Sequence, residues 1–420
     1  MSFQQGLSGL NATSKNLQII GNNIANANTF GSKVARAEFT DMYAKALNGA
    51  GTTSVGIGTS LAAVAQQFTQ GNIKTTENPM DLSINGAGFF QLTDGKSPVT
   101  FTRNGQFKVD RDGFIVNNSQ QRLMGYAADP QGQIQPGLSL ALQLPTSGVA
   151  PLPTTKIAIE MNLKSGSAIS LPASGVAIDF NDADTYNNAT SLTVFDAKGQ
   201  EVALTYYFQK TAEDTWDVYA TANGTTVNGV AGAPLPVTTL NFAANGSAPT
   251  SPTGPVTFSV PATTTSAGAL TLPIPGIQLD LSAATQYGTA FGVTDLTQDG
   301  FAAGQLTAIL VEPNGIVMAR YSNGRSSPAG QIEVANFRNP QGLQPIGDNA
   351  WSRTFQSGDA VTGVPGDGNL GVLQAGALEE SNIDLTAELV NMIVSQRIYQ
   401  ANAQTIKTVD QILQTLVNIR

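Results

Sequence analysis

The sequence predicts a multidomain, mainly β protein, in which two nested β-rich domains accompany an α-helical coiled-coil domain formed by the paired N- and C-terminal segments. Three observations support this fold class. Apolar residues recur at heptad steps near both ends of the chain. Between the ends, short apolar runs alternate with Asn-Gly and Asp-Gly pairs, which is typical of strands and hairpin turns. The 420 residues include 43 Gly and only 12% charged side chains, a composition typical of turn-rich β proteins.

Composition also restricts the function. Lys and Arg number 21 against 30 Asp and Glu, and the net charge of −9 disfavours a nucleic-acid partner. The chain has no His and no Cys, so it lacks the commonest general base, the soft metal ligands and any disulfide. Apolar runs are too short to span a membrane, and residues 1–20 lack the apolar core of a secretory signal. We therefore expect no membrane insertion and, for a protein of exported composition, export without a cleaved signal peptide.

The first predicted element is a helix that begins near residue 3. Its apolar ladder is formed by Phe3, Leu7, Leu10, Leu17 and Ile24. The stretch "NNIANANTFGSK" (22–33) follows, and its Asn and Gly residues are poor helix formers. It predicts a helix stop and hinge, in which amides are supplied by Asn22, Asn23, Asn26 and Asn28 while Gly31 takes a left-handed turn. Four Gly in residues 46–60 predict a flexible linker.

Residues 72–146 are predicted to be β. Strand spacing is seen at 107–109 and 114–116, and Asn104-Gly105 and Asp112-Gly113 predict hairpin turns. Segments 306–321 and 331–337 are predicted as strands that return to this domain. The alternative is that they form a second small domain.

Residues 147–285 predict an inserted β-sandwich or barrel, with strands at 191–195 and 203–208. Four Lys against ten acidic residues give this insertion a net charge of −6, so we expect it to point outward. The stretch "DFNDAD" (179–184) invites a calcium interpretation, but it lacks the Gly and Glu of an EF-hand loop and is interpreted as a solvated turn. Gly86-Ala87-Gly88 precedes a strand and is no dinucleotide loop. We predict no catalytic residues, no metal ligands and no cofactor.

The last predicted element is a helix capped by Asp384, with no Pro or Gly from 385 to 420. Its heptad ladder is formed by Leu385, Leu389, Met392, Tyr399, Ile406, Leu413 and Val417. Both ladders are interrupted by small or polar residues and are too thin to hold a lone helix together in water. Two interpretations remain open: an intramolecular helical hairpin, or packing in an assembly of many copies.

These elements divide the chain into four parts. The predicted parts are a helical inner domain (1–30 and 376–420), linker or hinge segments (31–71 and 360–375), a discontinuous β domain (72–146 and 286–359) and an inserted outer β domain (147–285). Prolines near the two joins of the outer domain are expected to stiffen them: Pro151, Pro153, Pro273 and Pro275.

Several stretches resemble one known family. "GLSGLNATSKNLQIIGNNIANANTFGSK" and "GALEESNIDLTAELVNMIVSQRIYQANAQTIKTVDQILQTLVNIR", which includes Ser381 and Asn382, are similar to the terminal signatures of the bacterial flagellar rod and hook axial proteins. "NPMDLSINGAGFFQL", "FTRNGQFKVDRDGFIV" and "VANFRNPQGLQPIGDNAW" agree with it. Ser32 departs from the aromatic residue usual there. The long insertion and "FNDADTYNNATSLTVFDAKGQEV" resemble the hook branch, with a distal rod subunit as the alternative.

The resemblance implies a structural subunit with no enzymatic activity, which self-assembles into a short curved tube. Such a tube is a universal joint that passes torque from rod to filament around a central export channel. The implied partners are many copies of the chain itself, the distal rod protein, the hook cap, the hook–filament junction protein and the flagellar type III export apparatus. The implied location is the extracellular flagellum. A secreted β-rich adhesin or enzyme is the alternative from another class.

An export signal is expected near the N-terminus. Phe39 and Tyr43 are spaced i, i+4 and are similar to the aromatic-x-x-x-hydrophobic element by which early flagellar substrates engage the export gate. Ordinary packing of a helix face is the alternative explanation for this pair.

Overall fold

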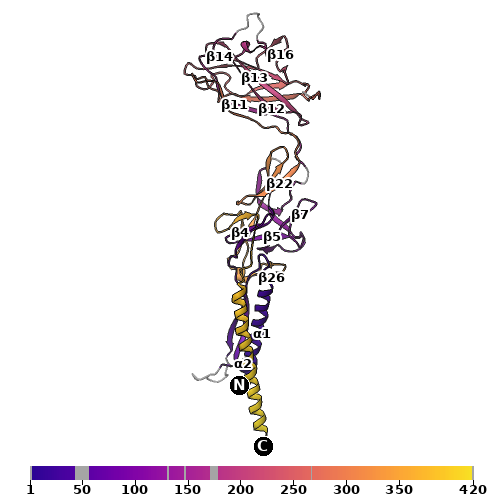
Figure 1. Ribbon diagram of the computed structural model, residues 1–420, viewed down its shortest axis with the longest axis vertical. Coiled ribbons are helices and arrows are strands. Elements are labelled where there is room, and N and C mark those ends of the chain that lie inside the picture. Colours follow the sequence, from indigo (N-terminus) through magenta and orange to yellow (C-terminus); the bar gives the residue numbers. More distant parts are fainter. Residues whose placement is uncertain are drawn as a thin grey trace. The chain divides into compact units, whose positions relative to one another are not determined.

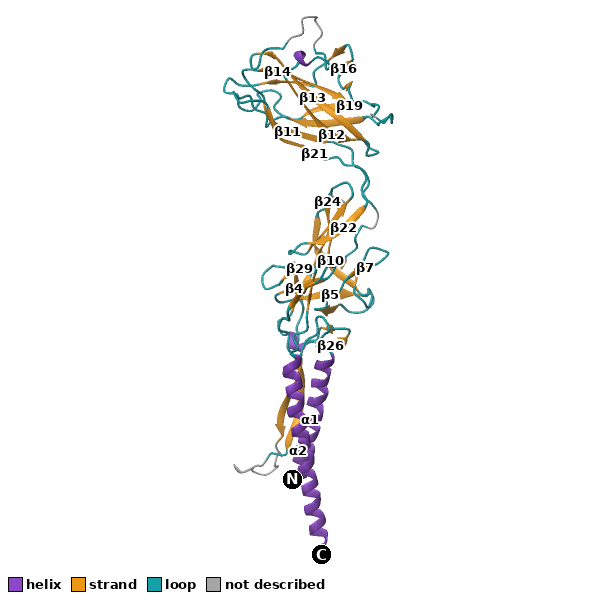
Figure 2. Cartoon of the chain, viewed as in Figure 1, coloured by secondary structure: helices purple, strands orange, loops and turns teal. Residues whose placement is uncertain are grey.

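The computed structural model describes residues 2–42, 56–129, 132–145, 148–170, 178–265 and 267–418. Two compact units are formed (Figures 1 and 2). Unit 1 consists of 1–146, 307–320 and 326–420, and unit 2 of 147–306 and 321–325. Strands dominate, and the two long helices, α1 (Ser2–Ala25) and α2 (Leu385–Asn418), lie at the ends of the chain and pack together. The predicted fold class is confirmed.

The β part of unit 1 is built on one branched sheet of 13 strands, whose main path runs β22-β23-β24-β9-β5-β6-β27-β26. The N-terminal strands of the unit are β1 (Ala35–Met42), β2 (Gly58–Gln66), β3 (Ile73–Thr75), β4 (Leu82–Asn85), β5 (Phe89–Thr93), β6 (Thr100–Thr102), β7 (Lys108–Val109), β8 (Ile115–Val116), β9 (Arg122–Ala128) and β10 (Ile134–Ala141). The returning strands are β22 (Leu306–Val311), β23 (Ile316–Tyr321), β24 (Ser326–Ile332), β25 (Val334–Asn336), β26 (Gln344–Gly347), β27 (Ala350–Ser352), β28 (Val361–Gly363), β29 (Val372–Ala375) and β30 (Ala377–Glu379). A short 3₁₀ helix, η2, spans Pro340–Gly342. The returning segments thus join the same domain, as the sequence predicts.

Two apolar clusters hold this sheet. One is centred on Phe90 and Phe107, whose rings meet edge to face at 5.2 Å. The other is aromatic, with Phe89 and Trp351 at 5.8 Å. The chain reaches this core from both ends, because β29 pairs with β4 and β30 pairs with β3. The segment before α2 is therefore fixed to the start of the β part.

The segment predicted as a linker, 31–71, is structured where it is described. β1 and β2 form an antiparallel hairpin that contacts α1. Ser8 of α1 donates from Oγ to the Thr59 carbonyl at 2.6 Å and accepts from the Thr59 amide at 2.7 Å. The linker prediction is wrong for these strands, because they pair with each other along their whole length and contact α1, although most of their side chains stay exposed. The predicted linker segment 360–375 likewise contains β28 and β29.

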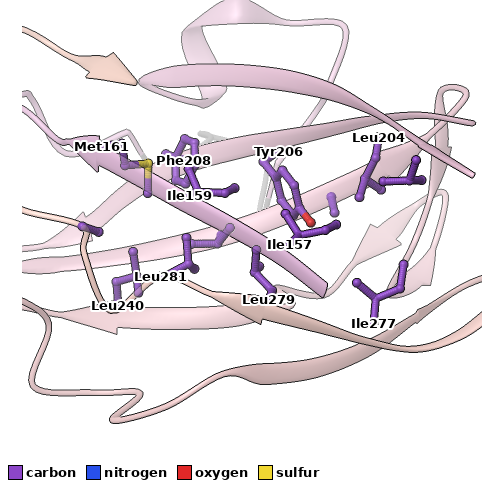
Figure 3. Close-up of a cluster of buried hydrophobic side chains, with 14 of the residues drawn as sticks. Ile157, Ile159, Met161, Leu204, Tyr206, Phe208, Leu240, Ile277, Leu279 and Leu281 are labelled. Carbon is purple, nitrogen blue, oxygen red and sulfur yellow. The ribbon is translucent and has the colours of Figure 1, made fainter. Parts of the chain in front are cut away.

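Unit 2 is a two-sheet sandwich. One sheet has the order β19-β20-β11-β21, and the other has the order β12-β13-β14-β15 with β18 beside β14. The strands are β11 (Lys156–Asn162), β12 (Asn188–Phe195), β13 (Glu201–Ala212), β14 (Thr215–Ala222), β15 (Thr225–Thr226), β16 (Gly229–Val230), β17 (Ala233–Pro234), β18 (Thr238–Asn241), β19 (Val256–Val260), β20 (Ile274–Asp280) and β21 (Gly292–Gln298), with the 3₁₀ helix η1 at Ala183–Thr185. Side chains of β11, β13 and β20 point toward one another in a dense apolar core (Figure 3).

The structure corrects three details of the sequence-based prediction. Unit 2 ends at 306 rather than 285, because β21 pairs with β11 and extends its sheet. Pro275 lies within β20 and Pro273 immediately precedes it, so neither is at a join. Asn104-Gly105 is no hairpin turn: a Cβ at Gly105 would lie 1.5 Å from the Leu82 carbonyl oxygen, so the glycine permits a close backbone approach.

Candidate functional site

The two helices pack antiparallel along a seam of small and polar residues (Figure 2). A Cβ added at Gly6 would lie 3.1 Å from Cγ1 of Ile406, and one at Gly9 would lie 2.9 Å from Nδ2 of Asn402. Further along, Asn16 donates from Nδ2 to Oγ of Ser395 at 2.9 Å, and Asn23 donates to Glu388 at 3.4 Å. The seam is thus held by close backbone approach and hydrogen bonds.

The predicted apolar ladders do not form this seam as a whole. On α1 the residues that contact α2 are Gly6, Gly9, Asn16 and Asn23, and the buried Thr13 and Ile20 continue their spacing. Each of these residues lies one position before a ladder rung, at 7, 10, 14, 17, 21 and 24. Phe3 and Leu7 are each 45% exposed, while Leu10, Leu17 and Ile24 are partly buried. The ladder consists of large apolar residues, whereas two helices that pack closely need small residues at their contact. Of the α2 rungs, Ile406 lies in the seam.

The rest of α2 presents apolar side chains to solvent. Leu385, Leu389, Tyr399 and Leu413 of the predicted ladder are exposed, Met392 is partly buried, and the side chain of Val417 lies outside the described residues. We name the exposed apolar residues of this helix the α2 stripe: Leu385, Leu389, Val390, Ile393, Val394, Ile398, Tyr399, Ile412 and Leu413. These residues lie on the sides of α2 that face away from α1. A helix that is apolar on several sides is built for burial.

The Asn-rich stretch after α1 turns the chain back toward the sheet. Asn26 donates from Nδ2 to Oδ1 of Asn22 at 2.6 Å where the helix ends. Asn23 bonds both backbone groups of Ala35, donating to its carbonyl at 2.8 Å and accepting from its amide at 3.0 Å. Asn28 is exposed in the following turn, and Gly31 has a φ of 71°, the left-handed conformation.

The matching stretch before α2 is equally well bonded. Asn382 accepts from the Val34 amide at 2.8 Å and donates to the Gln67 carbonyl at 2.8 Å, so one amide joins three chain segments. The Ser381 hydroxyl accepts from the Ile383 amide at 3.3 Å. Asp384 caps α2 by accepting from the Thr386 amide at 2.9 Å. The predicted hinge residues thus lie in a tightly hydrogen-bonded junction.

A buried ion triad, which sequence reasoning missed, lies at this junction. Glu379 meets Lys33 at 2.6 Å through Oε1 and Arg103 at 3.0 Å through Oε2. The side chains of Lys33 and Glu379 are fully buried, and that of Arg103 is 5% exposed. Burial lowers the pKa of Lys33 and of Arg103, and the Glu379 carboxylate opposes this shift in both.

Additional hydrogen bonds tie the triad to neighbouring segments. Lys33 donates to the Thr69 carbonyl at 2.7 Å, and Arg103 donates to the Gly86 carbonyl at 2.8 Å. A signal was present in the sequence, since charged residues are sparse and Lys33 and Arg103 stand in Gly- and Asn-rich stretches. Nothing in it paired them with Glu379.

The export candidate is only partly described. Phe39 lies on strand β1, is 40% exposed and pairs across the hairpin with Leu61. Tyr43 lies outside the described residues. The alternative of helix-face packing is wrong for Phe39, because the residue is in a strand.

One cavity lies beside the junction of α1 with the β part of unit 1. This cavity of about 410 Å³ between α1, the β1–β2 hairpin and β27 has Lys33 as its only titratable lining residue. Within the described ranges, no three potential metal-binding side chains lie together. Asp179 and Asp182 of the "DFNDAD" stretch accept hydrogen bonds from nearby backbone amides at 3.0 and 3.1 Å. Neither described helix is long and apolar enough to cross a membrane.

Family models match most of the chain. "Flagella basal body rod protein" matches residues 3–33, and "Flagellar basal body rod FlgEFG protein C-terminal" matches 374–419. "Flagellar hook protein FlgE/F/G D1 domain" matches 83–195, and "Flagellar basal body protein FlaE D2 domain" matches 162–301. The two middle matches overlap, and the packing of the chain sets the boundary at 146.

Full-length relatives carry one description. The flagellar hook protein FlgE of Escherichia coli K12 is 40% identical over 429 residues, with 100% of both chains covered. That of Salmonella typhimurium LT2 is 40% identical with the same coverage, and that of Rhizobium meliloti is 34% identical over 100% of this chain and 98% of its own. The crystal structure of Helicobacter pylori flagellar hook protein FlgE2 has a TM-score of 0.54 at 15% identity. It covers 73% of this chain and 100% of its own, and shows a shared fold.

Proposed function

Because this chain belongs to the flagellar hook protein family and is a structural subunit of the hook, we propose that its copies form a short curved tube that acts as a universal joint. In this proposal the tube passes torque from rod to filament and encloses a central export channel. Full-length similarity to hook proteins supports this over the distal rod protein, an adhesin or an enzyme. The α2 stripe is the observation that carries the proposal.

The physical argument compares the two sides of α2. The seam with α1 is polar and buries only one large apolar residue of α1, Ile20 at 5% exposure. The α2 stripe leaves Val390, Ile393 and Ile412 more than half exposed. Fully burying such a side chain contributes about 1.5–3 kcal/mol. Packing of several copies around each α2 supplies this stabilisation, so the helices gain more from neighbouring copies than from each other.

The proposed partners are those of a hook subunit, which lies between the rod and the filament. The chain contacts many copies of itself, the distal rod protein at one end of the tube, and the hook cap and hook–filament junction protein at the other. It is delivered by the flagellar type III export apparatus, works outside the cell and has no enzymatic activity. Membership of a structural family supports this assignment.

Unit 2 is proposed to supply the outer, bendable layer of the tube. It is a sandwich with its own core, formed by 147–306 with the short segment 321–325, and in this proposal it moves as a rigid body. Its net charge of −6 over residues 147–285 discourages adhesion between tubes. Neighbouring outer units would exchange hydrated contacts as the tube rotates.

Electron microscopy of polymers tests the proposal. The full chain should form curved tubes, and a variant with residues 147–305 replaced by a short Gly/Ser join should form tubes that lose their normal curvature. Unchanged curvature would mean that unit 2 does not contribute to the curvature of the tube. A full chain that stays monomeric at high concentration while binding a glycan or cleaving a substrate would instead favour the adhesin or enzyme.

Export through Phe39 and Tyr43 has a separate test. Phe39→Ala with Tyr43→Ala should lower secretion of the chain into the medium. Leu61→Ala is the matched control, because Leu61 is the cross-strand neighbour of Phe39 and is 37% exposed. Equal secretion of the double variant and the control rules out this pair as the signal.

A further inference from the structure

Phe355 is presented completely to solvent. Its exposed fraction is 102%, so its side chain is as exposed as in an extended peptide. The next most exposed phenylalanine of the described residues is Phe3, at 45%. A phenyl ring in water gains free energy wherever it can be buried, and aromatic side chains dominate the binding energy of protein interfaces.

The loop that carries Phe355 is rigid. Thr354 and Ser357 bond reciprocally on either side of it: the Thr354 amide donates to the Ser357 hydroxyl at 2.9 Å, and the Ser357 amide donates to the Thr354 hydroxyl at 3.3 Å. Ser357 is itself only 1% exposed. The Thr354 hydroxyl also donates to the Gly342 carbonyl at 2.6 Å. These bonds fix the backbone on both sides of the exposed ring.

Two more contacts anchor the loop to the β part of unit 1. Asn339 donates from Nδ2 to the Gln356 carbonyl at 3.1 Å. A Cβ added at Gly342 would lie 2.5 Å from the Ser357 amide nitrogen, so the loop backbone lies directly against η2. Because the backbone is already ordered, docking of Phe355 costs little further conformational entropy.

We propose that Phe355 is an anchor by which one copy of this chain docks on a neighbouring copy in the polymer. This inference rests on the proposed function and adds a contact in the β part of unit 1 to the contacts of the α2 stripe. An exposed apolar side chain that enters the surface of the next molecule makes a contact between unlike surfaces, and such contacts generate open helical assemblies.

Charge supports a second copy as the partner. The whole chain carries a net charge of −9, so most surfaces of two copies repel each other. In the loop itself, residues 353–359, the charges cancel, because Arg353 pairs with Asp359 at 2.5 Å and both side chains are exposed. The loop that carries the ring thus adds no net charge to the repulsion between two copies.

Polymerisation of the full chain with Phe355→Ser tests this. The ring is fully exposed on the described part of the chain, so the variant should keep the melting temperature of the wild type. Its critical concentration for polymerisation, measured by sedimentation, should rise at least about tenfold, the loss expected when an interface anchor is truncated. Gln356→Ser is the control, because it shortens an exposed polar side chain in the same loop and leaves the backbone bonds intact.

The outcomes separate two failures. If the wild type polymerises and Phe355→Ser does so at the same critical concentration, the anchor is wrong while the proposed function stands. If Gln356→Ser raises the critical concentration as much as Phe355→Ser, the effect belongs to the loop and the anchor is also wrong. If the wild type forms no polymer, the proposed function fails and the anchor fails with it.

Discussion

Unit 2 and the helix pair use apolar residues in opposite ways. In unit 2, large side chains such as Trp216, Phe208 and Leu279 are fully buried between two sheets. Among the described side chains of α1 and α2, Ile20 is the only large apolar one that is buried, and the α2 stripe faces solvent. Unit 2 therefore contains the apolar core that stabilises it, whereas the exposed stripe of α2 has no such core within the described residues and is proposed to be buried by other copies.

Removal of residues 385–420 should have the largest effect. It deletes the α2 stripe and one side of the helix seam, so we expect no tubes by electron microscopy at any concentration that assembles the full chain. The thermal transition of unit 2 should stay unchanged, because none of its core residues comes from this segment. Tubes formed by the truncated chain would show that the β units alone drive assembly and that the helices need no other copies.

The buried triad gives the next largest effect, because it lies where the helix-bearing segments meet the sheet. Glu379→Gln keeps the shape of the side chain but leaves Lys33 and Arg103 buried without a counter-charge. Loss of one partner of a buried ion pair costs about 3–5 kcal/mol. Thermal unfolding of unit 1 measures this loss. The matched control is Glu380→Gln, since Glu380 pairs with Lys74 at the surface and should matter little.

The same variant should have its own pH dependence. Burial places the pKa of folded Lys33 below its unfolded value of 10.5, so folding favours the neutral amine. Stability from this group is therefore greatest above pH 10.5 and falls as pH drops through the lowered pKa. Without Glu379, which raises the pKa of Lys33, this loss continues to a lower pH. The melting temperature of Glu379→Gln relative to wild type should rise with pH below the folded wild-type pKa of Lys33 and level off above it, and a difference that is flat throughout would contradict this account.

Truncation of one large side chain in unit 2 and of one in α2 should change monomer stability to very different extents. Phe208→Ala removes a fully buried ring from the core of unit 2 and should destabilise that unit by about 3–5 kcal/mol. Ile393→Ala removes a side chain that is 52% exposed on α2 and should change monomer stability by less than about 0.5 kcal/mol. Denaturant unfolding of the monomer measures both. Sedimentation should then show weaker assembly for Ile393→Ala, and a large loss of monomer stability for this variant would mean that the stripe is already buried.

Much of the fold follows from local signals in the sequence. Asp384 predicts the start of α2, Asp112-Gly113 predicts the turn between β7 and β8, and the apolar run at 203–208 predicts the centre of β13. Each depends on residues close in the chain, where propensity and hydrogen bonding decide the conformation. The full-length resemblance then supplied the family.

The features that the sequence did not predict depend on contacts between residues far apart in the chain. Gly6 and Gly9 mark the helix seam only because Ile406 and Asn402 pack against them, so a search for large apolar residues selected a face one residue away. Glu379 could be paired with Lys33 only once β30 had been placed beside the turn at Gly31, whose amide donates to the Glu379 carbonyl at 2.8 Å. Strand β21 escaped prediction because its identity depends on pairing with β11, more than 100 residues earlier.

The last prediction, of a small gain in stability, concerns a buried polar group in the apolar core of unit 2. The Tyr206 hydroxyl is fully buried and has no hydrogen-bond partner among the described residues, and burial raises its pKa. An unpaired buried polar group costs free energy, so Tyr206→Phe should stabilise unit 2 by about 1 kcal/mol in denaturant unfolding. Tyr207→Phe is the matched control, because Tyr207 is the next residue of the same strand and its ring packs on Phe180 at 4.8 Å, on the opposite face of the sheet. A loss of stability in Tyr206→Phe would mean that an internal water accepts or donates a hydrogen bond at the hydroxyl. The core of unit 2 would then need a bound water for its full stability.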